Sequence, residues 1–289
     1  MLALAICASA NPLFRPIRTT FEVYRDKKLD YYYDFDLEVA VKNLSLWIED
    51  LIQVKPYQKP INRSDITYFS DYYPPCAGGP ANNTDLLVTF YEIIGRPNSV
   101  MDRHFDVHIM DRDQDTGRPI RAVIFRILKI PSVQVDGDLL GALFQVLGVS
   151  RENMDFWLDP KTGHKYKKHP LTRVESSMTP KTYFLVNTPM AHDYVVRKFK
   201  AETVEGVPSG IEMNSEGTRL WGKTYYGEVP SIVPRHIVGN ATLTLLESTG
   251  WYKVNWGMAE YNSWNDVAFI GEENMPNFAF GPPQLSMPA

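Results

Sequence analysis

Apolar residues recur along the chain at two different periods, and these periods predict its main elements. Helical spacing marks residues 37–54, where Val41, Leu44, Ile48 and Leu51 fall on one face. Strands are expected where apolar residues alternate with polar ones or run without interruption. These segments are residues 21–24, 86–91, 104–110 and 122–130. Strands and helices mixed in this way predict an α+β fold.

The segment from Leu139 to Val149 is the most apolar of the predicted helices. The sequence Asp136-Gly137-Asp138 offers N-cap residues before it, and Gly148 is a typical C-terminal stop. Further helices are predicted within residues 150–158, 188–200 and 241–246, around a loop-rich stretch at 206–227. We therefore expect an N-terminal α+β part (residues 1–150), a central and C-terminal part (151–270) and an extended Pro-rich tail (271–289).

Composition and charge exclude several classes of protein. The chain has 289 residues, of which 44% are hydrophobic and 22% charged, as in ordinary globular proteins. Its net charge of -4 argues against a nucleic-acid-binding protein, which would carry a basic stripe. No apolar run reaches the ~18 residues of a membrane span. One short stretch is basic, and it is interpreted either as a solvated loop or as a contact for a lipid head group. Its lysines are Lys161, Lys165, Lys167 and Lys168.

Signals for the cellular compartment point in two directions. Cys7 and Cys76 are the two cysteines, and so low a count favours a reducing compartment or the mitochondrion. An apolar start (residues 1–10) looks like a truncated signal peptide, but we expect it to be retained as a packed segment. An organellar location is therefore favoured, with a secreted or cell-surface protein as the alternative. The glycosylation triplets that support this alternative begin at Asn43, Asn62, Asn82 and Asn240.

Familiar catalytic motifs are missing from the sequence. It contains no Gly-x-Ser-x-Gly elbow, no P-loop and no dinucleotide-binding glycine motif. His104 and His108 have the spacing of a zinc pair on a helix, but their segment alternates like a strand. On a strand the two residues lie roughly 13 Å apart, too far to share one ion. Acidic residues 111, 113 and 115 are interpreted as a solvated turn rather than a calcium loop.

Several segments resemble, in the same order, those of the leishmanolysin family of zinc metallopeptidases. The most recognisable is residues 242–255, Thr-Leu-Thr-Leu-Leu-Glu-Ser-Thr-Gly-Trp-Tyr-Lys-Val-Asn. Supporting segments are Gly117–Ile120, Asp159–Gly163, Asn187–Pro189, Val195–Phe199 and Glu205–Val207. The resemblance runs from about Pro16 to about Phe269. It implies a metzincin-like zincin fold with a mixed sheet, an active-site-type helix and a lower subdomain of loops and helices, the latter in residues 151–270.

The family's chemistry depends on a His-Glu-x-x-His helix, in which two histidines on one face bind zinc and the glutamate activates water. Aligning the closing glycine and Leu-Gly-Val-Ser puts Gly141 at the first ligand, Ala142 at the general base and Gln145 at the second ligand. Leu220 then stands at the third ligand, before Trp221. The family's Met-turn corresponds to residues 228–231. The resemblance therefore implies that every chemical position is degenerate.

Three functions are compatible with this reading. The first is a non-catalytic scaffold subunit of a larger assembly, with no metal or cofactor, that contacts other protein subunits through its N-terminus and C-terminal tail. A mitochondrial membrane assembly is one candidate. The second is an active zinc metalloendopeptidase whose ligands lie elsewhere. The third is a pseudoenzyme that still binds peptides in the old cleft, as an adhesion or regulatory protein.

Overall fold

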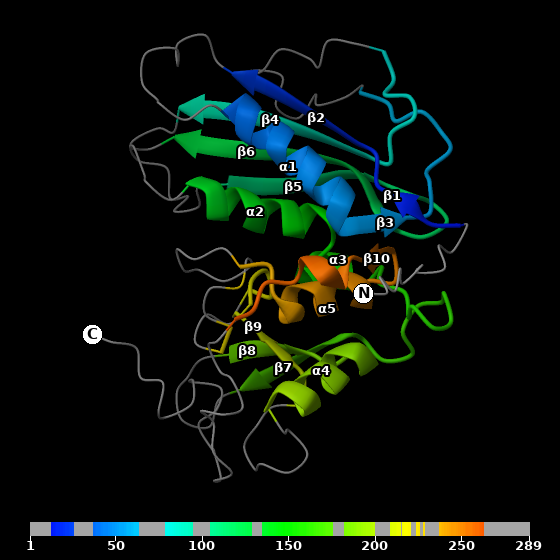
Figure 1. The fold of residues 1–289 in the computed structure, drawn as a ribbon, viewed down its shortest axis with the longest axis vertical. Helices are drawn as coiled ribbons and strands as arrows, with labels where there is room; N and C mark the ends of the chain where they lie inside the picture. The colour runs from blue at the N-terminus through cyan, green and yellow to red at the C-terminus, as the bar shows by residue number, and fades with distance from the viewer. Residues whose placement is uncertain are drawn as a thin grey trace, which may run out of the picture.

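The computed structural model shows a mixed α+β protein with its main sheet at one end and a group of helices and small sheets at the other (Figure 1). It describes residues 13–25, 37–63, 79–94, 105–128, 135–175, 182–199, 209–214, 216–220, 224–225, 228 and 237–262. The predicted contacts through the N-terminus and the tail 271–289 fall outside these residues. The α+β class expected from the sequence is confirmed.

The main sheet has four strands in the order β2-β4-β6-β5. Strands β2 (Thr19–Arg25), β4 (Leu86–Ile94) and β6 (Pro119–Leu128) run parallel, and β5 (Phe105–Arg112) is antiparallel to β6 at one edge. The long apolar runs of β4 and β6 occupy the two central positions, where both faces are covered. The strands predicted from the sequence are thus present, and they form one mixed sheet.

Helices α1 (Leu37–Leu51) and α2 (Val135–Val146) pack on the same side of this sheet (Figure 1). The other side carries a row of aromatic rings across the strands. Tyr24 stacks on Tyr91 at 5.3 Å between ring centroids, and Tyr91 stacks on Phe125 at 5.5 Å. Both faces of the sheet are therefore packed, although by different kinds of side chain.

The predicted helix over residues 37–54 was too long. It ends at Leu51, and β3 (Ile52–Val54) follows directly. Lys55 precedes a proline, which disfavours helical backbone, and β-branched residues favour a strand. Strand β3 pairs antiparallel with β1 (Arg15–Pro16) and β10 (Tyr252–Val254), so the C-terminal segment returns to the N-terminal part.

Helix α2 also begins earlier than predicted. It starts at Val135, so Asp136 and Asp138 lie in its first turn and do not precede it as caps. The C-terminal stop at Gly148 is confirmed, because its φ of +101° lies in the left-handed region that favours glycine.

The lower part of the molecule holds a small sheet that the sequence did not reveal. Its order is β7-β8-β9, and these strands are antiparallel. The helix predicted over residues 150–158 is only one turn long. The elements here are α3 (Arg151–Met154), β7 (Leu171–Glu175), β8 (Thr182–Val186), α4 (Pro189–Phe199), β9 (Ile211–Met213), α5 (Asn240–Ser248) and a 3-10 helix (Trp256–Met258).

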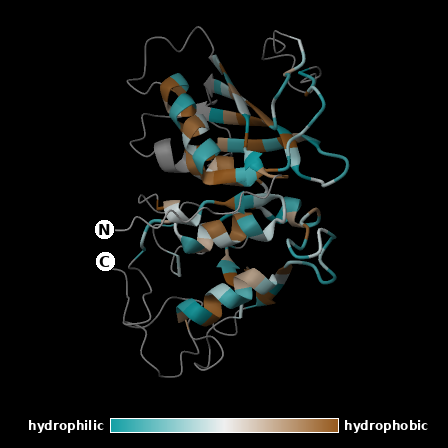
Figure 2. Cartoon of the chain, turned by 45° about the vertical axis from the view of Figure 1, so that its right-hand side comes forward, coloured by the Kyte–Doolittle hydropathy of each residue, from teal (hydrophilic) through white to brown (hydrophobic). Residues whose placement is uncertain are grey.

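One hydrophobic core joins the two parts across the boundary expected at residue 150. It includes Phe144 from α2, Trp157 after α3, Val195 from α4 and Leu245 from α5. Apolar residues concentrate on the main sheet and on the helices that cover it, whereas the peripheral loops are hydrophilic (Figure 2). Among the described residues, no helix is both long and apolar enough to cross a bilayer.

Candidate functional site

The positions of the zinc motif lie on α2, inside the hydrophobic core. Gly141 is buried, Ala142 is 2% exposed and Gln145 is half-buried. The remaining residues of this turn are also inaccessible, which makes α2 apolar on most sides rather than amphipathic. They are Leu143, Phe144, Val146 and Leu147, each 0% exposed. No side chain at the first-ligand or general-base position could therefore bind zinc or activate water.

Two tryptophans fix the C-terminal end of α2. The Trp157 indole donates a hydrogen bond to the Gly148 carbonyl at 3.0 Å. The ring of Trp251 lies directly over Gly148, where a Cβ atom would come within 2.4 Å of the ring. Trp251 belongs to residues 242–255, the segment on which the resemblance mainly rests, and this contact ties that segment to the end of α2.

The position of the third ligand is equally closed. Leu220 is 0% exposed and forms an isolated β-bridge with Met213 of β9. It extends the small sheet of the lower part, and its side chain belongs to the same core as α2. Trp221, which follows it, lies outside the described residues.

Glu228, at the expected Met-turn, acts as a cap for α5. Its carboxylate accepts hydrogen bonds from the Thr242 backbone at 3.0 Å, the Thr242 hydroxyl at 2.5 Å and the Ala241 backbone at 3.4 Å. Burial raises the pKa of Glu228, and the hydrogen bonds from Thr242 and the helix amides oppose this. Gly239 is needed beside it, because a Cβ there would lie 2.2 Å from the carboxylate. Pro230 lies outside the described residues.

A second buried carboxylate, Glu212, lies on β9. One of its oxygens accepts a hydrogen bond from the Thr224 hydroxyl at 2.5 Å, while Oε1 has no hydrogen-bond partner among the described residues. Burial raises its pKa to about 8, and the Thr224 bond only partly opposes this. No local pattern singled out this residue, because Ile211-Glu212-Met213 is a short segment inside the stretch 206–227 that was expected to be loop-rich.

The described histidines are dispersed, and each has its own local contact. His108 bonds Asp106 at 2.9 Å, a hydrogen bond that raises the histidine pKa. His169 bonds Asp155 at 2.9 Å, and His192 bonds the Ser209 carbonyl at 3.0 Å. No group of three or more His, Cys, Asp or Glu in the described ranges could hold a metal ion. His104 and His236 lie outside those ranges, and His164 is exposed in a turn.

The basic stretch forms a well-anchored, exposed hairpin. Asp159 accepts the backbone N–H of Lys161 at 2.9 Å, and Leu158 pairs with Lys165 in a β-bridge. The Tyr166 hydroxyl donates to the Ser248 carbonyl at 2.8 Å, which fixes the hairpin to α5. Lipid contact remains a prediction, and it concerns the exposed residues Lys161, Lys165, Lys167 and Lys168.

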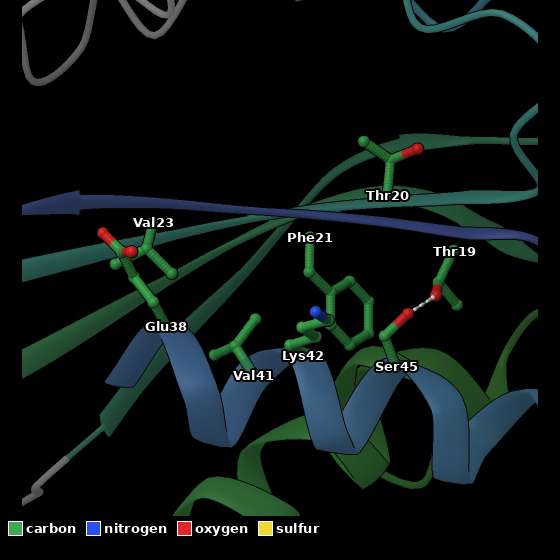
Figure 3. A pocket seen from close by; sticks show the side chains of 8 residues that line it. All are labelled: Thr19, Thr20, Phe21, Val23, Glu38, Val41, Lys42 and Ser45. Carbon is green, nitrogen blue, oxygen red and sulfur yellow. Dashed lines mark hydrogen bonds between the residues drawn. The ribbon is translucent and has the colours of Figure 1, made fainter. Parts of the chain in front are cut away.

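A pocket of about 550 Å³ lies between β2 and α1. Phe21, Val23 and Val41 form its apolar wall, and Glu38 and Lys42 are its charged residues (Figure 3). This pocket could not be predicted from the sequence. The apolar periodicity of β2 and α1 indicates only that their apolar residues pack in the core. Only the packing of the helix against the edge of the sheet leaves the space between them.

Protein-family models and curated proteins were both searched, and neither search gave a match to this chain.

Proposed function

We propose that this chain is a non-catalytic member of the leishmanolysin family that serves as a scaffold subunit of a larger protein assembly. One observation carries the proposal: the zinc-motif face of α2 is part of the hydrophobic core. Ala142, at the general-base position, is 2% exposed and adjoins fully buried residues. A catalytic glutamate there must instead reach a metal-bound water.

The arrangement of elements supports the metzincin-like fold that the resemblance implies. A mixed sheet with a single antiparallel edge strand, β5, leads through β6 into α2. The turn at residues 159–163 follows α2, and α5 leads through Trp251 into β10. These are the segments on which the resemblance rests, and they occur in that order around one core.

The burial of the old site favours a scaffold over a peptide-binding pseudoenzyme. Peptide binding in the former cleft needs an open groove beside Ala142 and Leu220, and both side chains are buried. Phe144 and Tyr225 are buried as well, at 0% and 3% exposed. Side chains of this size fill the space that a bound peptide would need. The protein therefore acts through the shape of its fold rather than through a cleft.

Metal analysis and a peptidase assay test the loss of chemistry. Protein dialysed after exposure to zinc is expected to hold no stoichiometric metal and to leave a library of peptides uncleaved. One zinc retained per chain, together with chelator-sensitive cleavage, would contradict the proposal. His108→Ala and His169→Ala serve as controls that identify zinc bound loosely at surface histidines.

The scaffold role is tested on the native protein. A tagged chain expressed in its own cells is expected to migrate in native electrophoresis far above its 33.1 kDa mass, whereas the purified chain alone migrates near it. Fractionation of the same cells shows whether the assembly is mitochondrial. A tagged chain found only as a 33.1 kDa monomer would contradict the role.

A further inference from the structure

Strand β2 is an edge of the main sheet, with β4 as its neighbour among the described strands. The backbone of Arg18, just before it, fixes which residues face β4. The Arg18 carbonyl accepts the Leu86 N–H at 3.3 Å, and the Arg18 N–H donates to the Asp85 carboxylate at 3.0 Å. Backbone groups alternate between the two sides of a strand. The even-numbered residues of β2 therefore face β4, and the odd-numbered residues direct their backbone groups away from it.

These outward residues are Thr19, Phe21 and Val23, and the same three line the pocket beneath α1 (Figure 3). Along α1, Glu38 lies level with Val23 and Lys42 lies close to Phe21 (Figure 3). The edge therefore offers backbone donors and acceptors beside a partly apolar hollow. Glu38 and Lys42, which carry opposite charges, follow one another along this hollow.

We propose that this edge binds an extended segment of a partner polypeptide, which adds as a strand beside β2 and directs alternate side chains into the pocket. A second backbone strand is the chemistry that pairs with a row of N–H and C=O groups. Strands in a sheet lie about 4.8 Å apart, so the incoming strand would run over the open side of the pocket. The surface goes beyond the scaffold role, and it depends on nothing at α2.

The charges of the pocket indicate the kind of segment. We expect an apolar side chain opposite Phe21 and Val41, and an acidic residue near Lys42. A second copy of this chain fits less well. Pairing β2 with itself would set two α1 helices over strands about 4.8 Å apart, whereas packed helices need about 8–10 Å.

A random heptapeptide library displayed on phage is the probe, with affinities of the enriched peptides measured by fluorescence anisotropy. In the enriched peptides, every second residue is expected to be apolar or charged, and the residues between them are expected to vary. N-methylation of the peptide amides that pair with β2 is expected to abolish binding. Ser45→Phe fills the pocket and is expected to weaken binding about tenfold or more. Asn43→Phe, at an exposed position of the same helix, is the matched control and leaves binding unchanged.

Two further variants separate backbone pairing from side-chain contacts. Thr19→Pro removes an outward N–H and is expected to weaken binding more than Thr19→Ala, which keeps that N–H and loses only the side-chain hydroxyl. Lys42→Glu is expected to shift the enriched peptides from acidic to basic residues at the facing position. Circular dichroism and thermal melting confirm that each variant folds.

Three outcomes would overturn this inference. They are a selection that enriches no peptide, binding that survives N-methylation, and a dimer seen by light scattering that Ser45→Phe dissociates. The last result would assign the edge to a second copy of the chain. Because these readouts do not involve metal or cleavage, they stand apart from the zinc and peptidase tests of the proposed function.

Discussion

Helix α2 and the region around α5 and β9 are both buried, but they differ in the polar groups that they enclose. At α2 the ligand and general-base positions are Gly141 and Ala142, and the helix is packed on nearly every side by apolar residues. Around α5, the carboxylates of Glu212 and Glu228 are 0% and 3% exposed. Buried carboxylates are therefore found around α5 and β9, whereas residues 139–146 of α2 carry none.

The contrast has a physical basis. A buried charge is tolerated only where hydrogen bonds replace its water. Glu228 has such partners, because the first amides of α5 need acceptors that the helix itself does not supply. Ala142 lies in the interior of α2, where the backbone amides bond within the helix, so a carboxylate there would find no such donors. Small apolar residues are therefore the stable choice at this position.

The largest effect is expected when a carboxylate is placed at position 142. Ala142→Glu places an unpaired carboxylate in the core of α2 and should lower the free energy of unfolding by about 4 kcal/mol. Gln145→Glu, at a half-buried position of the same helix, should cost less than about 1 kcal/mol. Urea denaturation measures both. Equal losses of stability in the two variants would mean that position 142 is no less accessible to water than position 145.

Gly148→Ala should be nearly as severe. The change strains a backbone with φ of +101° and drives a methyl group into the Trp251 ring. Strain and overpacking together should lower the stability by about 3 kcal/mol. Thermal melting is the measurement, with Gly163→Ala as control, since its φ is +71° but a Cβ there meets nothing within 4 Å. If both variants lose the same stability, the Trp251 contact contributes nothing.

Removal of the α5 cap should have an intermediate effect. Glu228→Ala leaves the amides of Ala241 and Thr242 without their acceptor and should cost about 2 kcal/mol. Glu228→Gln retains a carbonyl oxygen and should cost clearly less. Chemical denaturation of the two variants measures this difference in stability. A Gln variant as unstable as the Ala variant would show that the charge, not the acceptor, is required.

Counted per pH unit, the smallest effect is a dependence of stability on pH. The pKa of Glu212 is raised to about 8 in the folded chain, above its ordinary value of 4.5. Its contribution is therefore complete below about pH 4.5 and is lost as the pH rises through 8. The loss should approach about 1 kcal/mol per pH unit between these values. Denaturation from pH 5 to 8 measures the slope.

Glu212→Gln is the control for this slope. An amide does not titrate and still accepts the Thr224 hydroxyl, so the variant should show a shallower slope. The raised pKa values of Glu228 and His108 act in the same direction and will leave a residual dependence. An unchanged slope in Glu212→Gln would show that Glu212 is charged or hydrated in the folded protein.

Local patterns were sufficient for the long elements. The apolar runs of β4 and β6, the periodicity of α1 and the stop at Gly148 could all be read from neighbouring residues. Short elements were missed, because β8 and β9 are three to five residues long and gain their stability from pairing with distant segments. The same holds for β3, whose partners come from both ends of the described chain.

For the candidate site too, some features could be predicted from the sequence and others could not. The identities of Gly141, Ala142, Gln145 and Leu220 already predict that no zinc site remains at these positions. Their burial, the contact of Trp251 with Gly148 and the cap from Glu228 could not be predicted, since they join residues far apart in sequence. The pocket between β2 and α1 could not be predicted from the sequence either.

What the sequence alone determined is the long elements and the chemistry available at each position. Periodicity and residue identity are local properties, and they suffice to predict an α+β chain with an apolar helix at residues 139–149. Only the tertiary structure decided that this helix is enclosed and that β2 is an edge among the described strands, beside α1. Burial and strand pairing depend on contacts between distant segments, and no local pattern encodes them.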